Sequence, residues 1–457
     1  MTSTRHHPPV SPSKENQIMR RRTFSLAAAA SAAGFALSSC GSESAERGPD
    51  DEIIVTFWHS MRGNNAELLE GFVQEFNDSQ SEVRVEASFQ GMYDEAQTKL
   101  MQVVGTKDAP DLMQLGSGAK REIIDSGIAR PMQELIDAAG FDTSAIQPSI
   151  LHSRQVDEML YSMPQATSAA VLFFNRELFE NAGLDPDDPP QTFSEIRDAS
   201  QELVDSGLVD HGIAMLTTGG PFIDMMANQG ELLYNQDNGR SGTPTEAVFN
   251  SDAGVETMTW IRDLYEDGLL ANFGRSLDDL RPPWYSGDVA MILDTSAASI
   301  IHDQETSFEV GAGYFPVPDG VEPQGSVIGG ADLWIFIDSP DEAQTAAFDF
   351  VSHLLDPEVQ ARWAAGTGYY PITTASYDEP ALTTAMDEIE SIRVANEQVG
   401  DTQTNPASLG TDAGVTPTEY LGDAWERIYD GADPQDELDV AAEEVTSALE
   451  AYNDANG

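Results

Sequence analysis

The side chains that most often carry catalysis or bind metals are sparse in this chain of 457 residues. Its only cysteine is Cys40, and no two histidines form an H-x-x-x-H pair. The sequence contains no G-x-S-x-G elbow, no G-x-x-x-x-G-K loop and no dinucleotide-binding fingerprint after a strand. With 78 acidic residues, two carboxylates can become neighbours by chance. A secreted glycoside hydrolase is therefore the alternative, but no convergent catalytic set, cofactor site or metal site can be assembled.

Aromatic side chains in turns are the better candidates, and they indicate binding. Tyr93 lies in the turn Gly91-Met92-Tyr93-Asp94 before an expected helix, and the segment 366–371 reads GTGYYP. Such rings can stack on a sugar or on a cationic head group. Each ring taken alone is more readily explained as part of a hydrophobic core than as a ligand platform.

The charge of the chain excludes one class of partner. The formal net charge is −55, and only four lysines occur, at positions 14, 99, 107 and 120. A protein with so large a negative charge repels nucleic acid. We therefore expect no nucleic-acid partner. An acidic surface poor in lysine is most simply a solvated coat suited to a salty environment.

The N-terminal segment is typical of an export signal. Arg20, Arg21 and Arg22 precede Thr23-Phe24, and the apolar run 26–36 is well under the ~20 residues that a bilayer requires. We expect residues 1–39 to be a signal peptide of twin-arginine and lipoprotein type. The sequence Leu37-Ser38-Ser39-Cys40 resembles a lipobox, which implies a diacylated Cys40 on the outer face of the cell membrane and a tether over 40–51. The alternative is an ordinary cysteine within a leader.

The hydrophobic pattern predicts the elements that would position the candidate residues. Strands at 53–58, 83–89 and 111–115 alternate with helices at 64–77 and 93–104, an order typical of a parallel, doubly wound sheet. Further strands are expected at 159–164, 170–174 and 288–294. Helices are expected at 175–183, 192–207, 253–268, 342–355, 357–365, 380–397, 417–430 and 433–452.

The stretch Gln324–Asp338, QGSVIGGADLWIFID, is an apolar strand interrupted by Gly329 and Gly330. Paired glycines there indicate either a bulge in a buried strand or a close approach of another group to the backbone. Because a similar strand occurs near the start of the chain, we expect the chain to leave one domain, build a second and return. The length also suits two lobes rather than one core.

Five motifs together resemble one family, the substrate-binding proteins of bacterial ABC importers of the sugar-binding type. They are FWHSM (57–61), AGLDPDDPPQTF (182–193), SGDVAM (286–291), VIGGADLW (327–334) and TGYYPIT (367–373). Among its members, the chain most resembles the glycerol-3-phosphate-binding proteins. The resemblance implies an α/β, two-lobe periplasmic-binding-protein fold of type II, with a mixed sheet flanked by helices in each lobe and a ligand cleft between them. It assigns 52–165 and 308–338 to lobe 1, and 166–307 and 339–457 to lobe 2.

The same resemblance implies a set of ligand-binding residues: Tyr93, Ser117, Ser168, Thr295, Gly330 and Tyr369. Three departures argue against glycerol-3-phosphate itself. Ser117 replaces a glutamate, the segment 217–222 reads TTGGPF where a tryptophan pair is expected, and 406–414, PASLGTDAG, lacks the phosphate-binding arginine. Arg281 could substitute for that arginine, although a surface role is the alternative. We therefore expect a neutral sugar, a polyol or a glycerophosphodiester.

The function implied by the resemblance is capture of a small solute, without turnover and without a cofactor. The partners would be the permease and ATPase subunits of an ABC importer, and the membrane through the N-terminal lipid. Besides the hydrolase, a purely structural lipoprotein is the remaining rival class.

Overall fold

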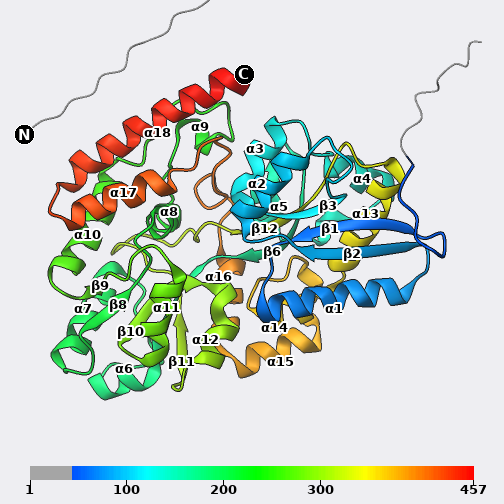
Figure 1. The fold of residues 1–457 in the computed structure, drawn as a ribbon. Helices are drawn as coiled ribbons and strands as arrows, with labels where there is room; N and C mark the ends of the chain where they lie inside the picture. Colours follow the sequence, from blue (N-terminus) through cyan, green and yellow to red (C-terminus); the bar gives the residue numbers. More distant parts are fainter. Residues whose placement is uncertain (1–43, 457) are drawn as a thin grey trace, which may run out of the picture. The chain divides into compact units, whose positions relative to one another are not determined.

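The computed structural model describes residues 44–456, so the predicted signal peptide and Cys40 lie outside the described residues. Two five-stranded sheets organise this part of the chain (Figure 1). The first sheet has the order β2-β1-β3-β12-β6. Its strands are β1 (Ile53–His59), β2 (Val83–Phe89), β3 (Leu112–Gly116), β6 (Met163–Ser168) and β12 (Gly329–Ile335).

The first three strands of this sheet are parallel, as their alternation with helices predicts. Strand β1 pairs in parallel with both β2 and β3, while β12 runs antiparallel to β3 and β6. The connecting helices are α1 (Gly63–Ser79) and α2 (Tyr93–Val103). Helix α1 buries Leu69, Phe72, Val73 and Phe76, which recur at helical spacing and so form one apolar face.

Strand β12 shows why a glycine pair interrupts an apolar strand. Gly330 has φ +105°, and a Cβ atom there would lie 1.8 Å from the carbonyl oxygen of Ala166 in β6. The pairing of β12 with β6 also shifts register between Ala331 and Asp332. Both explanations offered by the sequence therefore hold, because the strand carries an irregularity and its backbone is closely approached.

The second sheet has the order β11-β7-β10-β8-β9 and is also mixed. Strand β7 is antiparallel to β11 and β10, whereas β8 is parallel to β10 and β9. The chain enters this sheet directly from β6, with only Ala169 between the two strands. The strands are β7 (Ala170–Asn175), β8 (His211–Ala214), β9 (Leu270–Ala271), β10 (Val289–Thr295) and β11 (Val310–Gly313).

Local signals fix the helices around the second sheet. Thr192 caps α7 (Phe193–Asp205), with Glu195 completing the predicted capping box. Gly183, in the left-handed conformation at φ +87°, ends α6 (Arg176–Ala182). The other helices of this part are α8 (Gly219–Asn228), α9 (Asn235–Asn238), α10 (Asp252–Glu266), α11 (Leu277–Ser286), α12 (Ser299–Glu305), α17 (Thr418–Tyr429) and α18 (Pro434–Asn456).

The remaining helices differ in part from the expected division into lobes. Helix α13 (Asp341–Leu354) packs on β1 and β12 of the first sheet, and α14 (Pro357–Thr367) packs on α1. The expected division places both in lobe 2. Strand β11 lies in the segment assigned to lobe 1, yet it pairs with β7 of the second sheet. Apolar side chains of α13, such as Phe350, join the same buried cluster as Phe57 of β1, which explains where α13 packs.

The expected helix over 380–397 is two helices. They are α15 (Pro380–Glu388) and α16 (Glu390–Asp401), separated at Ile389, whose backbone is extended. Helix α16 packs on β11 of the second sheet. The rest of the elements are α3 (Lys120–Asp125), α4 (Met132–Ala139), α5 (Pro148–Arg154) and the hairpin of β4 (Gln155–Val156) and β5 (Met159–Leu160).

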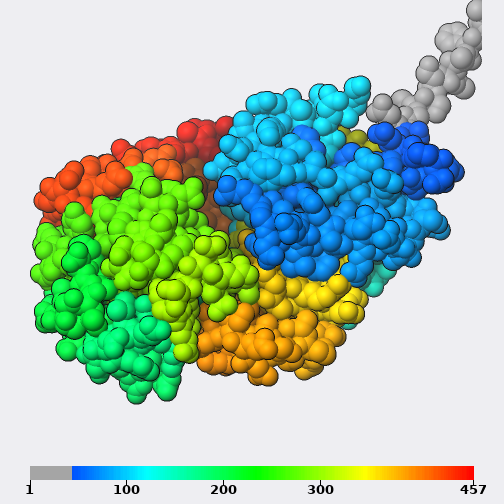
Figure 2. Space-filling view, turned by 60° about the horizontal axis from the view of Figure 1, so that its bottom comes forward, coloured from blue at the N-terminus to red at the C-terminus, as the bar shows by residue number. Residues whose placement is uncertain are grey.

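The two sheets share buried apolar contacts. One cluster runs from Val55 and Phe57 of the first sheet to Phe173 and Ile292 of the second. In the space-filling view, the blue surface of the N-terminal part adjoins green surface from the second sheet's helices, and orange surface from 357–401 lies along both (Figure 2). Within residues 44–456, no helix combines the length and apolar character that a membrane crossing requires.

Candidate functional site

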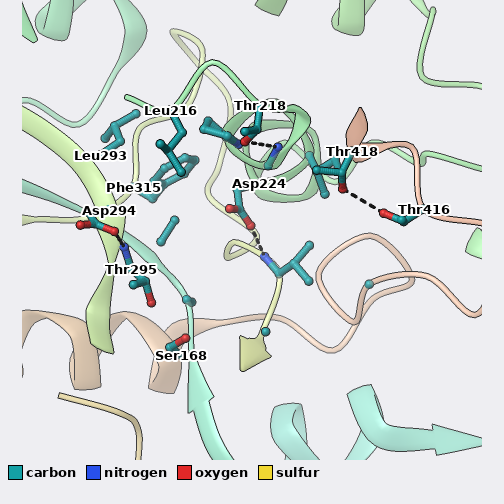
Figure 3. A pocket seen from close by; sticks show the side chains of 18 of the residues that line it. Ser168, Leu216, Thr218, Asp224, Leu293, Asp294, Thr295, Phe315, Thr416 and Thr418 are labelled. Carbon is teal, nitrogen blue, oxygen red and sulfur yellow. Dashed lines mark hydrogen bonds between the residues drawn. The ribbon is translucent and has the colours of Figure 1, made fainter. Parts of the chain in front are cut away.

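A cavity of about 460 Å³ lies where strands of both sheets meet (Figure 3). Ser168 at the end of β6 and Gly329 at the start of β12 contribute to its wall from the first sheet. The second sheet contributes the end of β10 and the segment from β8 into α8, and the loop 410–418 completes the wall. This arrangement places strand ends and a helix N-terminus around one space, as is common for ligand sites in α/β proteins.

The wall combines hydroxyl groups with apolar side chains. Its hydroxyl groups belong to Ser168, Thr218, Thr295, Thr411, Thr416 and Thr418. Its larger apolar side chains are Leu216, Ile223, Leu233, Leu277, Leu293 and Phe315. Hydroxyls can both donate and accept hydrogen bonds, while aliphatic groups pack on the C–H faces of a sugar or polyol. The chemistry of the wall therefore suits a small solute rich in hydroxyl groups.

Asp294, one of two charged residues in the wall, is fully engaged by its own neighbours. Arg281 Nε donates to its carboxylate at 2.8 Å, and the backbone N–H of Thr295 donates at 2.7 Å. His302 Nε2 lies 3.3 Å from the same carboxylate. Burial alone would raise the pKa of Asp294, but His302 and Arg281 outweigh burial and hold that pKa at about 2. This carboxylate therefore stays ionised and fixes the end of β10.

Asp224 on α8 is the other charged residue in the wall, and its situation differs. One carboxylate oxygen accepts a 3.2 Å hydrogen bond from the backbone N–H of Val327. Within residues 44–456, no arginine, lysine or histidine lies close enough to the Asp224 carboxylate to form an ion pair with it. Desolvation raises the pKa of Asp224 to about 7. In Figure 3 this carboxylate points into the space enclosed by the lining side chains.

Two of the six predicted ligand-binding residues, Ser168 and Thr295, line this cavity. Gly330 lies next to the lining residue Gly329, and its backbone is pressed against Ala166. The end of β6 and the start of β12 meet at the cavity because β12 returns to the first sheet and pairs with β6. Ligand contact by these residues remains a prediction.

Tyr93 and Tyr369 form a second group beside the cavity. Burial raises the pKa of both hydroxyls, and the two side chains interact with each other. Tyr369 also stacks on Trp363, with ring centroids 5.6 Å apart. The positive charge of Arg281 offsets part of the rise in the pKa of the Tyr369 hydroxyl. Arg281 is also the residue that binds Asp294 in the cavity wall. The two tyrosines are thus brought together, and Arg281 connects Tyr369 to the wall residue Asp294.

Ser117, the remaining predicted residue, begins a short 3-10 turn after β3 and is not among the lining residues of the cavity. Asp224 and the threonines around it were missed by sequence reasoning. The segment 217–222 was considered only for the tryptophans it lacks. Thr218 in this segment caps α8 by accepting a hydrogen bond from the backbone N–H of Gly220. A threonine N-cap is a sequence signal for the start of a helix, and a helix N-terminus often borders a ligand site.

The cavity also lacks a positive charge. Among the described residues that line it, none is arginine, lysine or histidine, and Arg281 is neutralised by Asp294 behind the wall. The absence agrees with the sequence of 406–414, which supplies Gly410 and Thr411 to the wall but no cation. Within residues 44–456, no group of three potential ligands is arranged to hold a metal ion.

Charged groups also connect the first sheet's helices with the loop that borders the cavity. Lys120 of α3 forms a buried ion pair with Asp412, and Arg240 lies 3.6 Å from the same carboxylate. Lys120 and Arg240 also donate to the backbone carbonyl of Ser153. The loop 402–417 is therefore tied to elements on both sides of the cavity.

Comparison with known proteins identifies the family. A family described as "Bacterial extracellular solute-binding protein" matches residues 71–388. The chain is 27% identical to the sn-glycerol-3-phosphate-binding periplasmic protein UgpB of Pectobacterium atrosepticum over 442 residues, which are 94% of this chain and 98% of the relative.

Two solved structures have the same fold. The structure of UgpB from Mycobacterium tuberculosis in complex with glycerophosphocholine superposes with a TM-score of 0.75 at 20% identity, over 87% of this chain and 98% of that one. An ABC transporter solute-binding protein from Thermotoga lettingae, bound with α-D-tagatose, gives a TM-score of 0.71 at 20% identity, over 87% and 99%.

These likenesses confirm the two-lobe, mixed α/β fold of a periplasmic solute-binding protein, and they set aside the hydrolase alternative because the matching family is one of solute-binding proteins. The relatives include an sn-glycerol-3-phosphate-binding periplasmic protein and an ABC transporter solute-binding protein bound with α-D-tagatose. On the match over residues 71–388, this chain belongs to the bacterial extracellular solute-binding proteins.

Proposed function

We propose that this protein is the substrate-binding component of an ABC importer, and that it captures a carbohydrate or a glycerophosphodiester in the cavity between its two sheets. The observation that carries the proposal is the cavity of about 460 Å³, whose wall combines six hydroxyl-bearing side chains with aliphatic ones. A space of this size fits a small sugar or polyol. Solute would be held by hydrogen bonds to the hydroxyls and by contact with the leucines.

Glycerol-3-phosphate is a poor candidate for this cavity. A phosphate group is usually bound by arginine, lysine or a helix N-terminus, and each charged hydrogen bond contributes roughly 1.5 to 3 kcal/mol. Among the described lining residues two carboxylates and no cationic side chain are present, so only the N-terminus of α8 would favour an anion. A solute with hydroxyl groups and no phosphate monoester would meet none of these penalties.

Capture would proceed by closure of the two lobes around the solute. The segments that connect the two sheets, 168–170, 313–329 and 367–390, would act as hinges, because the backbone passes there from the elements of one sheet to those of the other. The closed form would then dock on the permease of the importer, which an ATPase drives. Tyr93 and Tyr369 would pack on the solute from one side, and Ser168 and Thr295 would donate hydrogen bonds.

Anchoring to the outer face of the cell membrane would depend on Cys40, which lies outside the described residues. Two acyl chains at that thiol would hold the protein beside its permease. Metabolic labelling with a clickable fatty acid tests this: the wild type should incorporate the label, and Cys40→Ala should not. Label on Cys40→Ala would place the lipid elsewhere.

A thermal-shift screen tests the proposed function. The purified protein would be heated with maltose, D-tagatose, glycerol, glycerol-3-phosphate and glycerophosphocholine, since a ligand that binds the folded state raises its melting temperature. At least one sugar or glycerophosphodiester should raise the melting temperature with rising concentration and be recovered unchanged. A lack of any shift across sugars, polyols and glycerophosphodiesters would refute the proposed function.

A further inference from the structure

We propose that the Asp224 carboxylate contacts the solute directly and makes the cavity select an uncharged, polyhydroxylated ligand over a phosphate monoester. This inference rests on the proposed function and narrows its substrate class. It assigns the recognition of hydroxyl groups to a residue on α8 that none of the sequence motifs singles out.

The hydrogen bonding of Asp224 leaves acceptor capacity directed at the cavity. Only the backbone N–H of Val327, at 3.2 Å, donates to one of its oxygens within the described part of the chain. An ionised carboxylate can accept about four hydrogen bonds, so most of its acceptor positions remain for a ligand. Asp294 across the cavity offers far fewer, because Arg281 and the backbone of Thr295 already donate to both of its oxygens.

The placement of Asp224 favours donors on the ligand. Figure 3 shows its carboxylate among the lining side chains, on the same side of the cavity as Thr218 and Thr418. Neighbouring hydroxyls of a sugar could donate to the carboxylate and accept from the threonine hydroxyls at the same time. A phosphate monoester has few donors and carries negative charge, so the carboxylate would repel it.

A cationic head group fits the same cavity less well than a sugar. Quaternary ammonium groups are typically held by several aromatic faces. Phe315 is the only aromatic residue among the described lining residues, and Tyr93 and Tyr369, the two further rings proposed to meet the solute, lie together on one side of it rather than around it. Aliphatic groups beside hydroxyl-binding residues are suited to the alternating C–H and O–H groups of a sugar.

The pH dependence of binding supplies an independent readout. Since burial raises the pKa of Asp224 to about 7, the acceptor form becomes populated as the pH rises through neutrality. If only the ionised form binds, the apparent affinity should rise about 30-fold between pH 5.5 and 8.5, in proportion to the competent fraction.

The variant Asp224→Asn separates this change from the titration of other groups at the site. Asp294 stays ionised because its pKa is held at about 2, and burial lowers the pKa of His302 below its usual value of 6.5. Arg281 remains charged, and burial raises the pKa of the Tyr370 hydroxyl. Helices α10 and α17, which pack against α8, carry charged side chains that are exposed or half-exposed, such as Glu256, Glu419 and Asp423.

The test is isothermal titration of the wild type, Asp224→Asn and the control Glu256→Gln with maltose, D-tagatose, glycerol-3-phosphate and glycerophosphocholine at pH 5.5, 7.0 and 8.5. Glu256 is an exposed acid on the neighbouring helix α10, so its variant removes one charge without touching the cavity. Asparagine keeps the shape of the aspartate, and circular dichroism checks that each variant is folded.

We expect a neutral sugar to bind the wild type more tightly than glycerol-3-phosphate. Asp224→Asn should weaken this sugar at least 10-fold at pH 8.5 and abolish the pH dependence, whereas Glu256→Gln should change neither. The inference is overturned if the sugar binds Asp224→Asn as it binds the wild type, or if glycerol-3-phosphate or glycerophosphocholine binds the wild type best; in these cases the proposed function still stands. Binding of no solute at any pH would overturn both.

Discussion

Replacing Gly330 by alanine should destabilise the protein far more than the same change at the adjacent Gly329. A Cβ on residue 330 would lie 1.8 Å from the carbonyl oxygen of Ala166, a separation that real Cβ contacts do not reach. The residue also has φ +105°, a conformation that L-residues other than glycine rarely adopt. At Gly329 the nearest backbone atom would be the oxygen of Ser168 at 3.9 Å, which is an ordinary contact.

The magnitude follows from two costs that add at Gly330. Strain from the unfavourable backbone conformation costs about 1 to 3 kcal/mol, and overpacking of a closely approached strand costs about 1 to 3 kcal/mol. We therefore expect Gly330→Ala to lower the free energy of unfolding by roughly 2 to 6 kcal/mol. Gly329→Ala should change it by less than about 1 kcal/mol, toward higher stability, since alanine restricts the unfolded chain and its Cβ would meet only an ordinary contact.

Urea unfolding followed by circular dichroism, without ligand, measures both variants under identical conditions. We expect a clear shift of the midpoint for Gly330→Ala alone. Equal midpoints for the two variants would refute it, because they would show that β12 and β6 are not packed as closely at residue 330 as the structure has them. Measuring without ligand separates this packing role from any contact of the Gly330 backbone with solute.

Three further changes probe the buried charges and the aromatic group. Lys120→Met should destabilise the protein by about 2 to 4 kcal/mol in urea, less than a typical broken buried pair because Arg240 still faces Asp412. The pKa of Asp294 lies below its unfolded value, so this residue stabilises the fold above about pH 4. That contribution, about 2 kcal/mol, should disappear as the pH falls toward 2, so the stability gap between wild type and Asp294→Asn should close over this range in acid unfolding. Tyr369→Ala should abolish the ligand-induced thermal shift, because the ring would pack on the solute.

Matched controls accompany these three changes. Adding Asp412→Asn to Lys120→Met removes the stranded carboxylate, so the double variant should be less destabilised than the single one. Arg197→Ala breaks an exposed ion pair with Asp267, as a comparison for the buried pairs, and should lower the free energy of unfolding by less than about 1 kcal/mol. Tyr369→Phe keeps the stacking on Trp363 and should stay folded. A full thermal shift in Tyr369→Ala would show that Tyr369 does not contact solute.

The sequence predicted the parts of the fold that depend on local patterns. The alternation of strands and helices from Ile53 to Leu115 specified three parallel strands, and the cap at Thr192 marked the start of α7. The helix division at Ile389 was not predicted, because the apolar pattern continues on both sides of one extended residue. The packing of α13 on the first sheet was not predicted either, because it depends on contacts between residues that are far apart in the chain.

The candidate site was predicted only in part for the same reason. Ser168 and Thr295 end the strands β6 and β10, and the motif SGDVAM (286–291) marks β10. Asp224 carries no motif, and its importance comes from burial in a cavity that residues from distant segments close. With so many acidic residues in the chain, no sequence pattern distinguishes this carboxylate from a solvated one.

Calorimetric titration of a neutral sugar into the wild type and into Leu216→Trp, with the solute then recovered for mass spectrometry, tests the central claim most directly. Leu216 lines the cavity and is only partly buried, so tryptophan should fill the space with little effect on the fold. We predict one solute per chain, recovered intact, and at least 10-fold weaker binding to the variant. Cleaved solute, or equal binding by both proteins, would contradict the account.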